Sequence, residues 1–279
     1  LLRPFDSGKS GSDNRSRKQV GAKAIDQSAT KFGIRWFPDY VHFGPDGDTL
    51  LVSLCHVKRS ALCRIGKYSI AKNQWVVLPF EENRTYLNPV FSPDGQWIVA
   101  TRISVDQNIN LTREEFRLIK MRPDGSGMQN VGAGISGLGA NFSHDGKKLI
   151  YWRMYDNPGF PTYDFNLMDW ATGTETRLTE FNLFGSDGNR PFLTPDGEKF
   201  VFTARLSNVC VKDGNVVMIS SIMAARIKDI PLTCENVQEK VEVLWPGEGP
   251  NEPKDMDRQG RVLYSGSLNR KKEAGNPVA

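Results

Sequence analysis

Apolar residues along this chain come in short runs, and each run follows a tight turn rich in Pro, Asp and Gly. The clearest runs are 50–52, 97–100, 149–152 and 200–202. They are β-branched or aromatic and alternate only weakly with polar residues, which is typical of strands buried on both faces. The pattern therefore predicts an all-β protein built from many short strands.

The turn before each run is a repeated phrase. It is Phe-Ser-Pro-Asp-Gly at 91–95, with variants at 43–47, 142–146 and 193–197 and a decayed copy at 256–260. Pro presets the φ of one turn corner and Gly occupies the last corner without steric cost, so the phrase joins two strands. Copies about fifty residues apart indicate a radial or stacked β array.

Two further strands follow the first two in each repeat, for example 164–169 and 174–179 around a hinge at 171–173. Four antiparallel strands form one propeller blade, and a lone blade cannot bury both of its faces. The sequence predicts a β-propeller of four-stranded antiparallel blades, five or six in number. The last blade is expected to be incomplete, or closed by an N-terminal strand at 32–36.

The repeats also set the expected domain boundaries. A polar N-terminal extension and one propeller domain account for the whole chain. The extension covers 1–29 and the propeller 30–279, with blades at roughly 36–84, 85–134, 135–184 and 185–236 and an incomplete one at 237–279.

One known family shares this arrangement. Phe-Ser-Pro-Asp-Gly, an apolar strand and then Asn-Leu-Met-Asp at 166–169, Gly173 and Arg-Leu-Thr at 177–179 together resemble the TolB-type β-propeller repeat. The resemblance covers about 40–236 well and 237–267 poorly. It implies a fold and no single function, because the same repeat builds TolB, propellers of prolyl-oligopeptidase-type hydrolases and oligogalacturonate-lyase-like enzymes. The likeness to TolB implies a role in envelope assemblies.

The four cysteines fall into two pairs. Cys55 and Cys63 flank an expected hairpin. Cys210 is expected in a loop of the fourth blade and Cys234 just past its last strand. This even count favours two disulfides and a periplasmic or extracellular location, with buried thiols in a cytoplasmic protein as the alternative. No C-x-x-C spacing is present, so neither a zinc site nor another cofactor is expected.

The residues that could carry catalysis are scattered. The three histidines are His42, His56 and His144, and no Gly-x-Ser-x-Gly elbow is present. The net charge of +4 is mild and no long apolar run occurs, so neither nucleic-acid binding nor membrane insertion is expected. These features favour a binding role over an enzyme.

Arginines recur where the second strand of a blade ends. Arg102 follows Gly95 at the same spacing at which Arg153 follows Gly146. Arg205 follows Gly197 at a spacing that is one residue longer. Such a ring of guanidiniums on the rim could hold carboxylates of an acidic partner. Alternatively, each arginine could bridge two blades through the Asp of the next turn.

A second polar set precedes the innermost strands, at the expected mouth of the central channel. Its members are Asn88, Asn189, Arg190 and Glu252. Loops held by a rigid scaffold at such a mouth are common binding sites, although an Asn before Pro can also be only a loop cap. These observations favour a non-catalytic scaffold that binds a protein or peptide in an envelope or extracellular assembly. The alternatives are a carbohydrate-active or lyase-like propeller and a structural subunit of a larger complex.

Overall fold

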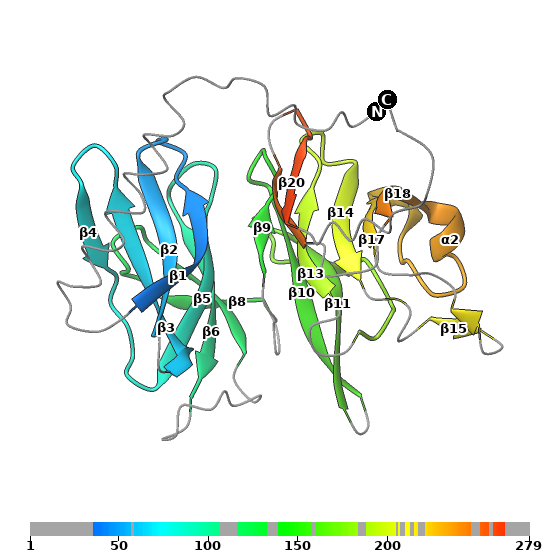
Figure 1. Cartoon of the computed structure of the whole chain (residues 1–279), viewed down its shortest axis with the longest axis horizontal. Helices are drawn as coiled ribbons and strands as arrows, with labels where there is room; N and C mark the ends of the chain where they lie inside the picture. Colours follow the sequence, from blue (N-terminus) through cyan, green and yellow to red (C-terminus); the bar gives the residue numbers. More distant parts are fainter. Residues whose placement is uncertain are drawn as a thin grey trace, which may run out of the picture.

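In a computed structural model, the described part of the chain is built almost wholly of antiparallel sheets (Figure 1). The described residues are 36–56, 59–105, 116–132, 139–157, 160–183, 188–204, 206, 210–212, 215–216, 221–246, 252–256 and 259–265. Among them, the short 3₁₀ turn η3 (Ile227–Asp229) and helix α2 (Val237–Lys240) join strands of one sheet.

Each of the first two sheets uses four strands that are consecutive in the chain. The first sheet contains β1 (Trp36–Phe43), β2 (Thr49–His56), β3 (Arg59–Ser69) and β4 (Gln74–Val77). The second contains β5 (Arg84–Phe91), β6 (Ile98–Ser104), β7 (Arg117–Met121) and β8 (Gln129–Val131). This up-and-down order is the expected form of a propeller blade.

The next two sheets repeat the design. The third contains β9 (Asn141–Phe142), β10 (Lys148–Asn157), β11 (Phe160–Asp169) and β12 (Glu175–Arg177). The fourth contains β13 (Gly188–Leu193), β14 (Lys199–Ala204), β17 (Ser221–Arg226) and β18 (Val241–Pro246), with the hairpin β15 (Val211–Lys212) and β16 (Asn215–Val216) inserted between its middle strands. Because β18 belongs to it, the fourth sheet extends beyond residue 236.

The number of blades differs from the expectation of five or six. The described residues form four complete blades, and a two-stranded sheet of β19 (Glu252–Met256) and β20 (Val262–Ser265) follows them. The decayed turn at 256–260 therefore does join two strands. Trp36 of the expected closing strand begins β1 and pairs with His56 of β2. Residues 32–35 lie outside the described residues, so the closure of the ring by this strand stays a prediction.

The repeated turns of successive blades contact one another where a Pro lies beside a Gly. Gly95 has a φ of +69°, and a Cβ at this position would lie 3.1 Å from Pro45 in the turn of the preceding blade. In the same way, a Cβ on Gly146 would lie 3.5 Å from Pro93. The pattern breaks at the fourth blade, where His144 replaces the preceding Pro and the space next to Gly197 is open. Pro-on-Gly contact thus accompanies blade stacking and is not required for it.

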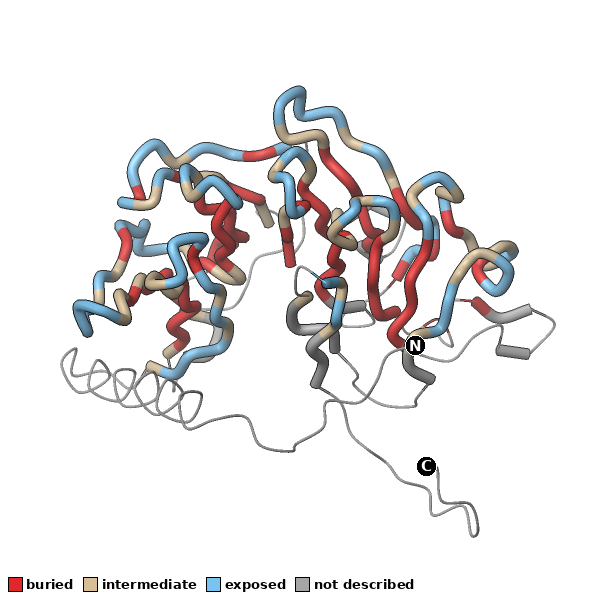
Figure 2. Tube along the Cα trace, turned by 90° about the horizontal axis from the view of Figure 1, so that it is seen from above, coloured by how far each residue is buried: buried red, intermediate tan, exposed pale blue. Residues whose placement is uncertain are grey.

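Buried apolar side chains of the described residues form a separate cluster at each interface between successive sheets. Figure 2 shows that the buried residues lie mostly along the strands. Leu51 and Ile98 belong to the cluster between the first two blades, and both are completely buried. The largest cluster lies between the third and fourth blades and contains Phe165 and Phe202, whose ring centroids are 5.4 Å apart. Burial between sheets is therefore the main apolar contribution to the fold, as expected when one blade cannot bury both of its faces.

Both expected disulfides are present. Cys55–Cys63 joins facing positions of β2 and β3, with the two Cα atoms 4.0 Å apart. Cys210–Cys234 links the segment after β14 to the segment after η3, with Cα atoms 5.1 Å apart. Closing a loop in the unfolded chain typically stabilises a protein by roughly 2–4 kcal/mol.

Candidate functional site

The first strand of each sheet lies at the centre of the propeller. Strand β5 contacts β1 and β9, and β13 contacts β9 and β19. Polar side chains of these inner strands therefore meet although they come from distant parts of the sequence. We call Tyr40, His42, Asn88, Asn141 and Arg190 the inner ring.

Arg190 contacts the member of the inner ring that is furthest from it in the sequence. Its guanidinium carbon lies 3.6 Å from the centroid of the Tyr40 ring, and only 9% of the residue is exposed. Arg190 is in the fourth blade and Tyr40 in the first, so this contact crosses the centre of the propeller. A desolvated cation over an aromatic face is worth about 2 kcal/mol. The contact therefore joins the two ends of the blade series.

His42 lies on the same strand as Tyr40. Its Nδ1 accepts a hydrogen bond of 3.4 Å from the backbone N–H of Phe91 in the second blade. Burial, assisted by the positive charge of Arg190, lowers the pKa of His42 to about 4. The imidazole is therefore neutral at physiological pH and acts as a hydrogen-bond acceptor.

Asn88 lies at an irregularity of β5, between Leu87 and Val90. Its φ is +53°, a left-handed conformation that Asn adopts more readily than other residues with a Cβ. Its backbone N–H donates to Ser53 Oγ in the first blade over 3.0 Å. The local backbone of Asn88 thus helps to hold two blades together.

The inner ring also contains a residue that sequence reasoning missed. Asn141 of β9 is 6% exposed, and its Nδ2 donates to the carbonyl oxygen of Pro191 over 2.9 Å. This bond connects the third and fourth blades. The signal was its position directly before a repeated turn, but an Asn there looks like an ordinary strand residue until the next blade is placed beside it.

The two described rim arginines bind carboxylates close to them. Arg102 Nη1 lies 3.0 Å from Glu81 Oε1, and Arg102 Nη2 donates to Asn130 Oδ1 over 3.2 Å. Arg153 pairs with Glu175 of the same blade. The Asp of the next turn is Asp145 for Arg102 and Asp196 for Arg153. Each instead accepts hydrogen bonds within its own turn, and these bonds keep its pKa below the usual value. The described arginines thus do not bridge blades through these Asp residues.

Three of the expected site residues cannot be placed in either set. Asn189 lies in β13 and Glu252 in β19, but the side chains of both are outside the described residues. Arg205 also lies outside them. The structure places Asn88 and Arg190 on the inner strands β5 and β13. Arg102 and Arg153 lie on the second strands β6 and β10 of their blades.

Blade three contains a further buried charge that the sequence did not reveal. Asp164 is completely buried and accepts hydrogen bonds from Arg177 over 2.6 Å and from Thr179 over 2.8 Å. Burial raises the pKa of its carboxyl group. Because Arg177, Thr179 and the backbone N–H of Phe181 all converge on it, Asp164 fixes the segment after β12.

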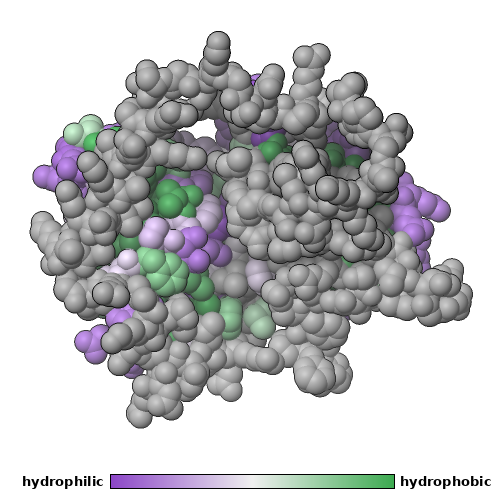
Figure 3. Space-filling view, in the orientation of Figure 1, coloured by the Kyte–Doolittle hydropathy of each residue, from purple (hydrophilic) through white to green (hydrophobic). Residues whose placement is uncertain are grey.

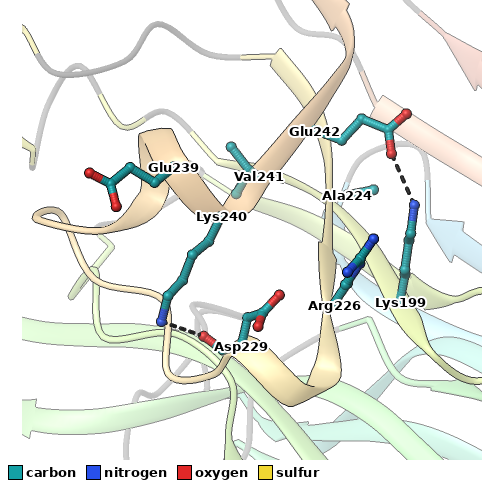
Figure 4. A pocket seen from close by; sticks show the side chains of 8 residues that line it. All are labelled: Lys199, Ala224, Arg226, Asp229, Glu239, Lys240, Val241 and Glu242. Carbon is teal, nitrogen blue, oxygen red and sulfur yellow. Dashed lines mark hydrogen bonds and ion pairs between the residues drawn. The ribbon is translucent and has the colours of Figure 1, made fainter.

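The surface offers two other features outside the inner ring. A hollow of about 450 Å³ on the fourth blade is lined by balanced charges, and its Lys199 lies 3.0 Å from Glu242 (Figure 4). Polar and hydrophobic side chains are mixed on the left of the view in Figure 3. Phe43 of β1 is 61% exposed.

Metal-binding clusters and membrane-spanning helices are both absent from the described residues. No group of His, Cys, Asp or Glu side chains there has the arrangement that holds a metal ion. None of the helices in the described part of the chain is long and apolar enough to cross a membrane.

Comparison with known proteins defines the class. No family model matches the chain, and no curated protein matches it. Solved structures do match it, among them a TolB protein from Agrobacterium tumefaciens with a TM-score of 0.60 and 17% identity over 84% of this chain and 71% of that one. The nidogen/laminin complex gives a TM-score of 0.55 and 10% identity over 84% and 72% of the two chains. An oligogalacturonate lyase in complex with manganese gives 0.51 and 15% over 80% and 57%.

These likenesses establish the class of the protein as a β-propeller with TolB-like structural neighbours. At such low identity they establish the fold alone. The expected likeness to TolB is thus supported at the level of structure, and function has to be argued from the site.

Proposed function

We propose that this propeller is a non-catalytic scaffold that binds a protein or peptide partner at the mouth of its central channel, in an envelope or extracellular assembly. The observation that carries the proposal is the convergence of Arg190, Tyr40 and His42 from opposite ends of the blade series. Polar groups held by rigid strands at the centre of a propeller provide a preformed recognition surface.

The inner ring is better suited to recognition than to proton transfer. His42 has a pKa of about 4, and its Nδ1 already accepts a backbone hydrogen bond. A general base works best when its pKa lies near the operating pH. Because Nδ1 of the neutral imidazole is the acceptor, Nε2 carries the proton and can instead donate a hydrogen bond to a partner while Arg190 supplies positive potential.

The compartment proposed for this assembly is periplasmic or extracellular. The disulfides Cys55–Cys63 and Cys210–Cys234 persist in oxidising compartments and are rare in the cytosol. The nidogen/laminin complex also supports a protein-binding propeller by analogy.

The partner site can be mapped with a photo-crosslinking amino acid. One variant carries it at Arg102 on the rim, and a matched variant carries it at Val243, which is 44% exposed on the outer strand β18. We expect the native partner to crosslink from position 102 and not from position 243. Crosslinks confined to position 243 would move the site to the outer side of the propeller.

A lyase-like enzyme is the second candidate, because of the structural likeness to the oligogalacturonate lyase. Incubation of the protein with oligogalacturonate and added Mn²⁺ tests it through the absorbance of the unsaturated product. We expect no turnover above a sample without protein. Turnover that depends on the metal would overturn the scaffold proposal.

A further inference from the structure

The proposed binding function makes no use of one three-residue motif in the second blade. Asn83-Arg84-Thr85 has the form Asn-x-Ser/Thr, which is the acceptor motif for N-glycosylation in secreted proteins. Three other triplets share this form and begin at Asn14, Asn110 and Asn141. Asn14 and Asn110 lie outside the described residues. The environments of Asn83 and Asn141 are both described and can be compared.

Asn83 is exposed in the turn directly before β5. Its backbone carbonyl oxygen accepts a hydrogen bond of 3.1 Å from Val105 N–H, which fixes the turn. Its side-chain amide takes part in none of the hydrogen bonds found between described residues. A sugar on Nδ2 would therefore extend into solvent without replacing an existing contact.

Asn141 provides the opposite case within the same chain. It is 6% exposed, and its Nδ2 donates to Pro191 between two blades. A glycan on this nitrogen would need the space occupied by the fourth blade, since protein interiors are closely packed. The fold thus accepts a glycan at one of these motifs and excludes it at the other.

The hydroxyl of the motif indicates when transfer has to occur. Thr85 is completely buried, and its Oγ1 accepts a hydrogen bond of 2.7 Å from Cys63 N–H. A transferase that recognises the Thr85 hydroxyl must therefore act at an early stage of folding, when β5 has not yet packed against the first blade. Disulfide formation and this early modification take place in the same secretory compartment.

We propose that Asn83 is an N-glycan acceptor and that Asn141 is not. The donor is a lipid-linked oligosaccharide, and the new bond joins Asn83 Nδ2 to C1 of the first sugar. The bond between C1 and the lipid diphosphate breaks, the diphosphate leaves, and the amide proton passes to a base of the transferase. The glycan would lie beside Glu81 and its partner Arg102, so a partner bound at this rim has to leave room for it.

To test this, the full chain is expressed as a secreted protein in eukaryotic cells. The secreted protein is treated with peptide N-glycosidase F in H₂¹⁸O, and its peptides are then measured by mass spectrometry. We expect ¹⁸O-labelled Asp at position 83 and unmodified Asn at position 141. Asn83→Gln should remove one glycan from the intact mass, and Thr85→Ser should keep it because the hydroxyl remains.

Two results would overturn the proposal. One is secreted wild-type protein in which Asn83 is wholly unmodified. The other is a folded, secreted protein that carries its glycan on Asn141. The melting temperature of Asn83→Gln, compared with that of the enzymatically deglycosylated wild type, separates loss of the acceptor from loss of the fold.

Discussion

The inner ring and the rim use the same residue type for different purposes. Arg190 of the inner ring is 9% exposed and lies over an aromatic ring of a distant blade. Arg102 of the rim has a partly exposed side chain and lies 3.0 Å from Glu81. The inner arginine therefore connects blades across the centre, whereas the rim arginine makes a local ion pair near water.

This difference teaches that a recurring arginine is not by itself a ligand for an acidic partner. A partner carboxylate at the rim would have to compete with Glu81 for Arg102 and with Glu175 for Arg153. The environment, more than the residue type, decides the energetic value of each charge: exposed pairs contribute about 0–1 kcal/mol, and desolvated contacts contribute more.

The largest effect is expected at Arg190. Arg190→Ala should destabilise the protein by about 2 kcal/mol, because it removes a buried cation–aromatic contact together with the packing of its aliphatic stem. Chemical denaturation of Arg190→Ala, Tyr40→Leu and the double variant measures the coupling, which we expect to be about 1–2 kcal/mol. Strict additivity of the two single changes would show that the inner ring does not connect these blades.

Protonation of His42 at low pH should reduce the stability of the protein almost as much as Arg190→Ala does. The folded pKa of His42 is about 4 and its unfolded value is 6.5, so the unfolded state binds more protons between these values. Stability should therefore be complete above pH 6.5 and fall as the pH decreases toward 4, by about 1–2 kcal/mol at pH 5. His42→Gln should lack this part of the pH profile, and Arg190→Ala should raise the His42 pKa measured by NMR. If the stability of His42→Gln depended on pH in the same way as that of the wild type, His42 would not be the cause of the loss.

A smaller effect is expected at Asn88, where the backbone conformation matters more than the side chain. Asn88→Ala should cost about 1 kcal/mol, because an Ala Cβ is strained at a φ of +53°. Asn88→Gly keeps the backbone relaxed and should cost clearly less, which makes it the cleaner variant for partner binding. Equal losses in both variants, measured by urea unfolding, would show that the side-chain amide carries the stability instead.

The smallest effect is expected at the rim. Arg102→Ala should change the free energy of unfolding by less than about 1 kcal/mol, since its pair with Glu81 is partly exposed and screened by salt. Comparison at low and high salt checks the electrostatic origin, with Arg122→Ala as a control cation that stacks on Trp97. A loss as large as that of Arg190→Ala would remove the distinction between rim and inner ring.

Several features of this protein could be predicted because they depend on short stretches of chain. The Pro-Asp-Gly turns, the strands beside them and the disulfide between Cys55 and Cys63 involve residues that are close in sequence. The partners of Arg190 and Asn141 could not be predicted in this way, since each lies in a different blade. The blade count was also uncertain from sequence, because the decayed fifth turn gives two strands and no signal for two more.

The sequence by itself thus determined the repeating unit, since turn chemistry and apolar runs act locally within about fifty residues. Only the tertiary structure decided which polar side chains face each other at the centre, which arginines are neutralised on the rim, and which Asn-x-Ser/Thr motif remains open. The physical reason is that burial and charge pairing depend on the surfaces of neighbouring blades. Asn83 and Asn141 have the same motif, and the packing of the fourth blade on Asn141 distinguishes them.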